Sequence, residues 1–128
     1  MPDPQDPATL RRSRLDWDEP AAPRHARILE RHRALIRLRR EVPALTDPRF
    51  STVRCGWDDE ARWFRLDRDG VSVLWNFADE ERSVPVGGAS AIRFATGAAT
   101  VVGHAVALSA RSVAVVEWSP RLSSPVAG

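Results

Sequence analysis

The sequence predicts a mainly β protein with one helix near its N-terminus, in which the strands form an antiparallel β-sandwich. Two observations predict this class. Residues 23–41 carry apolar side chains at helical spacing, whereas from about residue 50 apolar and polar side chains alternate. Turn-forming residues then interrupt the alternation about every ten residues, as is typical of antiparallel sandwiches. A chain of 128 residues is long enough for one domain with its own core.

The first 22 residues are expected to form an irregular loop. Four prolines (Pro2, Pro4, Pro7 and Pro20) fall in this stretch, and each fixes φ and removes a backbone donor. A short turn is expected at residues 7–14. The stretch has few apolar side chains, so any order must come from contact with another surface.

A helix is predicted over residues 23–41. Pro23 suits the first helical turn, and Pro43 disfavours helical geometry at the residue before it. One stripe of the helix is apolar, and its members are Ile28, Leu29, Leu35, Ile36 and Leu38.

Seven strands are predicted after the helix, in a domain that covers residues 46–119. They are Ser51–Gly56, Ala61–Asp67, Val71–Phe77, Arg82–Val86, Ala91–Ala95, Thr100–Leu108 and Ser112–Trp118. Residues 120–128 are rich in Ser, Pro and Ala and are expected to form a flexible tail. Residues 1–45 form the separate N-terminal part.

Composition argues against several classes of protein. All 19 basic residues are arginine, which explains a pI near 9.8 at a net charge of +2 without a nucleic-acid partner. No apolar run reaches the roughly 20 residues of a membrane span, so no membrane partner is expected. The single cysteine excludes an internal disulfide. The polar, acidic N-terminus is unlike a secretory signal, so a cytoplasmic location is expected.

No catalytic group, metal site or cofactor is expected. The carboxylates gather at 58–60 and 79–81, where a glycosidase pair is possible but solvated hairpin turns are the favoured interpretation. His25 and His32 lie near one helix face without an evident third ligand nearby, and the three histidines, with His104, are expected to be surface or packing residues. The sequence shows no Cys–His–Asn arrangement that would make Cys55 a catalytic nucleophile.

The tryptophans offer the main candidate for binding. In the strand 61–67, Trp63 and Arg65 share one face while Phe64 and Leu66 share the other. An exposed Trp63 could stack on a sugar ring. The competing and favoured interpretation is that the second apolar face of this hairpin is covered, by the helix or by another domain.

Several segments resemble the malto-oligosyltrehalose trehalohydrolases, glycoside hydrolases of the α-amylase family (family 13). The stretches at 3–9 (Asp-Pro-Gln-Asp-Pro-Ala-Thr) and 13–17 (Ser-Arg-Leu-Asp-Trp) resemble a segment late in their catalytic domain. Residues 28–45 are similar to the last helix of their (β/α)8 barrel, although family members often have an aromatic residue in place of His32. Residues 74–78 and 112–116 are similar to their C-terminal β-sandwich.

The resemblance implies a C-terminal fragment: residues 1–45 as a remnant of a truncated barrel and residues 46–119 as the sandwich. It implies that a full-length parent hydrolyses the α-1,4-glucosidic bond that releases trehalose in trehalose biosynthesis. The catalytic carboxylates of the family lie upstream, so the chain alone is expected to be inactive. Gln5, Asp6 and Trp63 are the candidate contacts to malto-oligosyltrehalose or α-glucan. The chain is expected to come from a truncated gene or a misplaced start.

Two alternatives stay open: a freestanding α-glucan-binding module, or an interaction domain whose helix stripe docks on a partner. In each case the uncovered apolar faces imply a missing barrel or another partner.

Overall fold

The computed structural model describes residue 3 and residues 5–118. The chain divides into two compact units, Met1–Ala34 and Leu35–Gly128, and each is described by itself. The division falls inside the long helix, and Leu38 in the last turns of that helix packs with the sheet that follows. The predicted tail at 120–128 lies outside the described residues.

The N-terminal unit is more regular than the irregular loop that the prolines predict. It contains the short helix α1 (Pro7–Arg12), the 3-10 turn η1 (Glu19–Ala21) and the first part of α2. Pro7 occupies the first helical position, and the Asp6 carboxylate accepts a hydrogen bond from the Ala8 amide at 2.8 Å. The helix forms because a proline at this position lacks only a donor that would be unpaired anyway, while Asp6 caps the end.

Helix α2 (Pro23–Glu41) has the bounds that the sequence predicts. Its apolar stripe is largely uncovered, since Leu38 is its one buried side chain, while Leu35 and Ile36 are 42% and 53% exposed. Neither described helix is both long and apolar enough to cross a bilayer.

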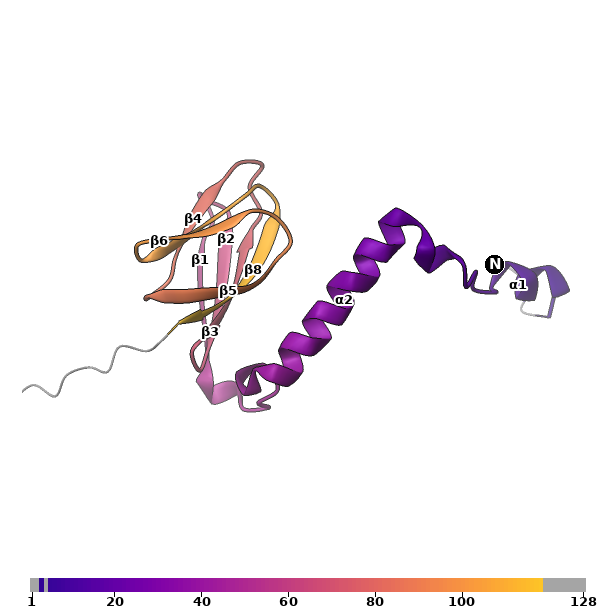
Figure 1. Ribbon diagram of the computed structural model, residues 1–128, viewed down its shortest axis with the longest axis horizontal. Coiled ribbons are helices and arrows are strands. Elements are labelled where there is room, and N and C mark those ends of the chain that lie inside the picture. The colour runs from indigo at the N-terminus through magenta and orange to yellow at the C-terminus, as the bar shows by residue number, and fades with distance from the viewer. Residues whose placement is uncertain (1–2, 4, 119–128) are drawn as a thin grey trace, which may run out of the picture. The chain divides into compact units, whose positions relative to one another are not determined.

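The C-terminal unit consists of two antiparallel sheets, joined to α2 by the 3-10 turns η2 (Pro43–Leu45) and η3 (Phe50–Thr52). The larger sheet has the order β1-β2-β3-β8-β5, and the smaller has the order β4-β7-β6 (Figure 1). The strands are β1 (Val53–Asp58), β2 (Trp63–Arg68), β3 (Val71–Asn76), β4 (Arg82–Pro85), β5 (Ala89–Ala95), β6 (Ala99–Val102), β7 (Ala105–Leu108) and β8 (Ser112–Trp118).

The prediction of a single strand over Thr100–Leu108 is wrong. The chain forms a hairpin there, in which β6 pairs with β7 and Val101 lies opposite Val106. Gly103 occupies the turn with φ of +59°, a conformation that glycine adopts without steric cost. The alternation of apolar residues continues through Gly103 and hides the turn, so the described chain has eight strands instead of seven.

The main core lies between the two sheets. Its buried side chains come from strands β3, β4, β7 and β8 and from Val86 just after β4. They are Leu74, Val84, Val86, Val106, Leu108, Ala114 and Val116. Leu74, Val84, Val106 and Leu108 have no exposed surface, so each contributes about 1.5–3 kcal/mol of burial free energy.

The larger sheet has a second apolar face, which is turned away from the smaller sheet and is called the outer face below. At one end of the outer face, Leu38 of α2 and Val42, which directly follows the helix, form a second core cluster with Val71 and Val115. The sequence prediction that the hairpin over residues 61–77 carries apolar side chains on both faces is thereby confirmed. The end of α2 covers only part of the outer face.

Candidate functional site

The uncovered part of the outer face carries a row of aromatic side chains across three neighbouring strands. The register places Trp57 of β1 opposite Phe64 of β2, and Phe64 opposite Trp75 of β3. Directly paired residues project from the same face of a sheet. The rings of Phe64 and Trp75 are in contact, with centroids 5.4 Å apart and planes inclined by 56°. Phe77 follows two residues after Trp75. We call these four residues the outer aromatic patch.

The outer aromatic patch is open to solvent at both ends. Trp57 is 63% exposed and Phe77 is 58% exposed, whereas Phe64 and Trp75 are half-buried. Trp75 and Phe77 line a groove of about 320 Å³ together with Val113, a volume at the lower end of the range for ligand sites. Large apolar side chains gathered on one exposed face mark an interaction site more often than isolated ones do.

The charged groups beside the groove are paired with each other. Arg111 lines the groove and donates a hydrogen bond to the Asp79 carboxylate. This hydrogen bond, with the positive charge of the guanidinium, holds the pKa of Asp79 below its usual range and raises the pKa of Arg111. The other polar side chains of the groove, Asn76 and Ser112, are buried and donate hydrogen bonds to backbone carbonyls. The groove therefore offers apolar area and few free hydrogen-bonding groups.

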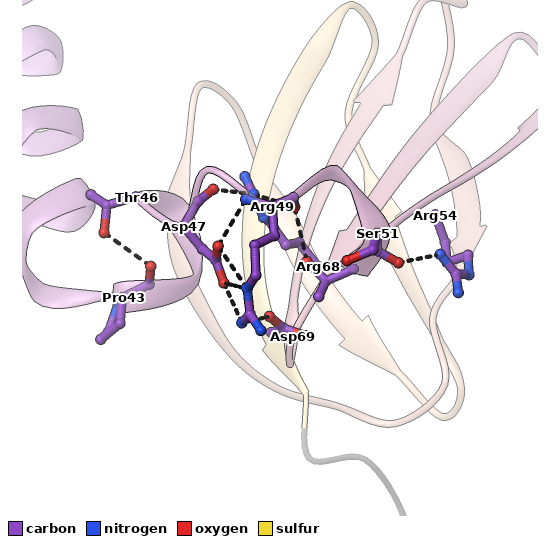
Figure 2. A network of polar contacts seen from close by, with 9 residues as sticks. Pro43, Thr46, Asp47, Arg49, Ser51, Arg54, Arg68 and Asp69 are labelled. Carbon is purple, nitrogen blue, oxygen red and sulfur yellow. Dashed lines mark hydrogen bonds and ion pairs between the residues drawn. The ribbon is translucent and has the colours of Figure 1, made fainter.

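A polar network holds the corner where η2 leads into β1 (Figure 2). The Asp47 carboxylate accepts hydrogen bonds from the Arg49 backbone amide at 2.9 Å and from the Arg49 guanidinium at 2.5 Å. Arg68 of β2 donates to the backbone carbonyls of Asp47 and Arg49. Arg49 also lies 3.9 Å from the Asp69 carboxylate. The network ties the chain that leaves α2 to the β2–β3 hairpin.

This network makes the stability of the corner depend on pH. Chiefly through the side-chain hydrogen bond from Arg49, the pKa of Asp47 is lowered from 3.8 to about 2. A carboxyl whose pKa is depressed by folding stabilises the fold above its ordinary pKa, and this contribution is lost as the pH falls through the folded value. We expect Asp47→Asn to lower the free energy of unfolding at neutral pH, and to flatten its decline between about pH 4 and pH 2.

Urea denaturation across this pH range checks the expectation, with Asp59→Asn in the exposed β1–β2 turn as the control. An Asp47→Asn protein whose stability falls with acid as steeply as that of the unchanged chain would contradict the role assigned to Asp47.

The three predicted sugar contacts are placed as follows. Gln5 and Asp6 are exposed in the N-terminal unit, and the Asp6 carboxylate is engaged in capping α1. Trp63 belongs to the C-terminal unit and packs against the main core, on the face opposite to the outer aromatic patch. The cluster on which the half-buried indole packs comes from the two sheets rather than from the helix or another domain.

The turn interpretation of the carboxylate clusters agrees with their contacts. Asp58 accepts a hydrogen bond from the Ala61 amide at 2.8 Å within the β1–β2 turn. Asp79 pairs with Arg111, and Glu80 with Arg82. Each of these carboxylates stabilises a turn or a nearby strand.

The histidines of α2 line a groove of about 270 Å³ in the N-terminal unit, and both have partners. His25 Nδ1 lies 2.9 Å from the Glu19 carboxylate, and His32 Nδ1 lies 2.9 Å from the Ile28 carbonyl oxygen. Within residues 3 and 5–118, no three His, Cys, Asp or Glu side chains gather as a metal site.

The outer aromatic patch was not predicted as a unit. The sequence shows Trp57, Phe64 and Trp75 as members of separate alternating strands. Only the register of both hairpins places them in one row, and register depends on turn geometry as well as on the hydrophobic pattern.

Comparison with protein families gives a match over the sheet domain. The model of a domain of unknown function, DUF3459, matches residues 48–115, which is more than half of the chain. The chain belongs to the DUF3459 family. The matched region begins at the corner network and ends within β8, so it contains the outer aromatic patch and most of both sheets.

Relatives of this DUF3459 chain include proteins named malto-oligosyltrehalose trehalohydrolase. The protein from Rhizobium sp. (strain M-11) is 44% identical over 116 residues, which are 91% of this chain and 20% of the relative. The protein from Brevibacterium helvolum is 47% identical over 79 residues, 62% of this chain and 13% of the relative. That from Mycobacterium tuberculosis (strain ATCC 25618 / H37Rv) is 36% identical over 88 residues, 69% of this chain and 15% of the relative.

These matches confirm the resemblance to trehalohydrolases that the sequence motifs indicate. The chain spans about a fifth of the length of the Rhizobium relative. No solved structure matches the chain significantly.

Proposed function

We propose that this chain serves as the non-catalytic β-sheet domain of a longer enzyme that hydrolyses malto-oligosyltrehalose and releases trehalose. The bond cleaved would be the α-1,4-glucosidic bond next to the terminal trehalosyl unit. The observation that carries the proposal is the 44% identity, over 91% of this chain, to a protein named malto-oligosyltrehalose trehalohydrolase. The cytoplasmic location expected from the sequence stays a prediction.

Hydrolysis of the glucosidic bond is assigned to the part of the enzyme that this chain does not match. Glycoside hydrolysis requires two carboxyl groups about 5–9 Å apart whose pKa values are separated by their surroundings. Among the described carboxyls, Asp47, Asp58 and Asp79 are engaged by neighbouring arginines or a turn amide. Their contacts support a structural role for each.

Helix α2 is proposed to be the last helix of a (β/α)8 barrel, with the sheets as the domain that follows the barrel. Its uncovered apolar stripe supports this, because Ile28 and Ile36 are 46% and 53% exposed. A helix in such a barrel buries one face against the neighbouring strands. The alternative, a freestanding interaction or α-glucan-binding module, would present the same stripe to another partner.

Gln5 and Asp6 are proposed to approach the sugar in the longer enzyme. Support comes from the resemblance of residues 3–9 to the late catalytic-domain segment of trehalohydrolases, and from the exposure of both side chains. Asp6 also fixes the start of α1, which would hold Gln5 in place beside it.

The isolated chain is expected to release no trehalose from maltotriosyltrehalose, because the proposed catalytic carboxylates lie outside it. The assay measures trehalose chromatographically, with the Rhizobium sp. (strain M-11) trehalohydrolase as the positive control. Tryptophan fluorescence is recorded while maltodextrin is added to the same sample. Trehalose release by the pure chain would contradict the non-catalytic role. A fluorescence change that depends on maltodextrin would favour the freestanding glucan-binding module instead.

A further inference from the structure

The outer aromatic patch adjoins a surface that is already an interface within the chain. The end of α2 and the residue after it cover one part of the outer face through Leu38 and Val42, which pack on Val71 and Val115. Val73 and Phe94 border this cluster. Val73 and Trp75 are two residues apart on β3 and share one face. The covered part therefore continues into the outer aromatic patch without a polar boundary along that strand.

The chemistry of the patch favours a protein partner over a sugar. Sugar sites combine an aromatic platform with polar groups that are free to bond hydroxyls. Here the polar neighbours are engaged, because Arg111 pairs with Asp79 and Asn76 donates to backbone carbonyls. The centre of a protein interface is instead rich in tryptophan, phenylalanine and arginine and has few free polar groups, as this patch does.

We propose that the outer aromatic patch is the docking surface for the folded remainder of a trehalohydrolase, the four-fifths of the Rhizobium relative that this chain does not match. This inference rests on the proposed function and names the partner surface within it. Trp57 and Phe77 would be the anchors, since they are the most exposed members of the patch. The partner covers the part of the outer face that α2 leaves open.

A second copy of the chain is the less favoured occupant. The continuity with α2 favours a partner that contacts the helix end and the sheet together. The Rhizobium relative has four-fifths of its length outside the match, which is enough chain to form such a partner. Self-association of the isolated chain through the same patch is thus one outcome of the test.

Cys55 reports directly on whether the patch is covered. It is the single cysteine of the chain, it is exposed, and it lies two residues from Trp57 on β1, so both side chains project from the outer face. Val102 supplies a matched control, because it is 58% exposed on β6 of the other sheet. A cysteine placed there lies outside the proposed interface.

The test compares the isolated chain with a chimera, in which this chain replaces the matching segment of the Rhizobium trehalohydrolase. Iodoacetamide labelling of Cys55 is followed by peptide mass spectrometry. We expect Cys55 to react at least about tenfold more slowly in the chimera, because a covered thiol reacts only when the interface opens. In a Cys55→Ser background, Val102→Cys is expected to react at similar rates in both proteins. Trp57→Ser with Phe77→Ser is expected to abolish the protection of Cys55.

Equal labelling of Cys55 in both proteins would overturn the inference while leaving the proposed function intact, provided that the chimera releases trehalose. A folded chimera that releases none would count against the proposed function itself. If the chimera does not fold, sedimentation velocity of the isolated chain shows which partner occupies the outer aromatic patch. A concentration-dependent dimer that Trp57→Ser removes would assign the patch to a second copy and overturn the inference, whereas a monomer that binds the truncated Rhizobium enzyme would support it.

Discussion

Replacing Asn76 with aspartate is expected to unfold the C-terminal unit at neutral pH. Asn76 is 2% exposed, and its Nδ2 lies 2.8 Å, 3.1 Å and 2.9 Å from the carbonyl oxygens of Glu80, Leu108 and Ser109. Its Oδ1 accepts a hydrogen bond from the Ala78 amide at 2.9 Å. A carboxylate at this position would direct a charged oxygen at three carbonyl oxygens and lose every bond that the amide donates.

The expected cost is a large share of the total stability. Each buried polar group left without a partner costs about 1–3 kcal/mol, and an unpaired buried charge costs more, while a whole domain is stable by about 5–15 kcal/mol. Asn76→Ala is expected to cost about 3 kcal/mol, because it removes the donors without adding charge. Circular dichroism during urea unfolding measures both variants.

The pH dependence of the aspartate variant provides an independent check. Burial against carbonyl oxygens raises the pKa of a carboxyl group, so the destabilisation grows as the pH rises from the ordinary pKa to the raised folded-state pKa, and it is relieved as the pH falls and the group is protonated. An Asn76→Asp protein that is as stable as Asn76→Ala at neutral pH would contradict the contacts assigned to Asn76.

Two tryptophans on the β1–β2 hairpin are expected to differ sharply when each is replaced with alanine. Trp63 packs against the main core, so Trp63→Ala is expected to destabilise the isolated chain by about 3 kcal/mol. Trp57 is 63% exposed on the outer face, so Trp57→Ala is expected to change the stability by about 0.5 kcal/mol or less. Thermal unfolding of the two single variants measures the contrast. Equal losses would show that the hairpin does not present the two faces described above.

The helix and most strands could be predicted because their signals are local. Pro23 and Pro43 bracket α2, and the alternation of apolar residues marks β3 and β8 with nearly the observed bounds. The hairpin at Gly103 was missed because alanine and valine continue the alternation on both sides of it. The short helix α1 was missed because prolines dominate its surroundings, although Asp6 followed by Pro7 is itself a helix-start signal.

The candidate site could not be predicted because it depends on contacts between distant segments. Trp57 and Trp75 lie on strands separated by β2, and their common face follows only from two registers. The partnership of Asp47 with Arg49 is local, but the two carbonyls that bind Arg68 are brought to it by the path of the chain between α2 and β1. The strand pattern around Trp63 shows that its face is apolar, but it does not show that strands distant in the sequence cover that face.

The role proposed for this DUF3459 chain is that of the non-catalytic domain of a trehalose-releasing enzyme. The most direct test is the rate of trehalose release from maltotriosyltrehalose by the chimera that carries this chain in place of the matching segment of the Rhizobium enzyme. We predict kcat/KM within about tenfold of that of the Rhizobium enzyme, a difference of about 1.4 kcal/mol in transition-state stabilisation. A chimera that unfolds cooperatively, and is therefore folded, yet releases no trehalose would contradict the claim.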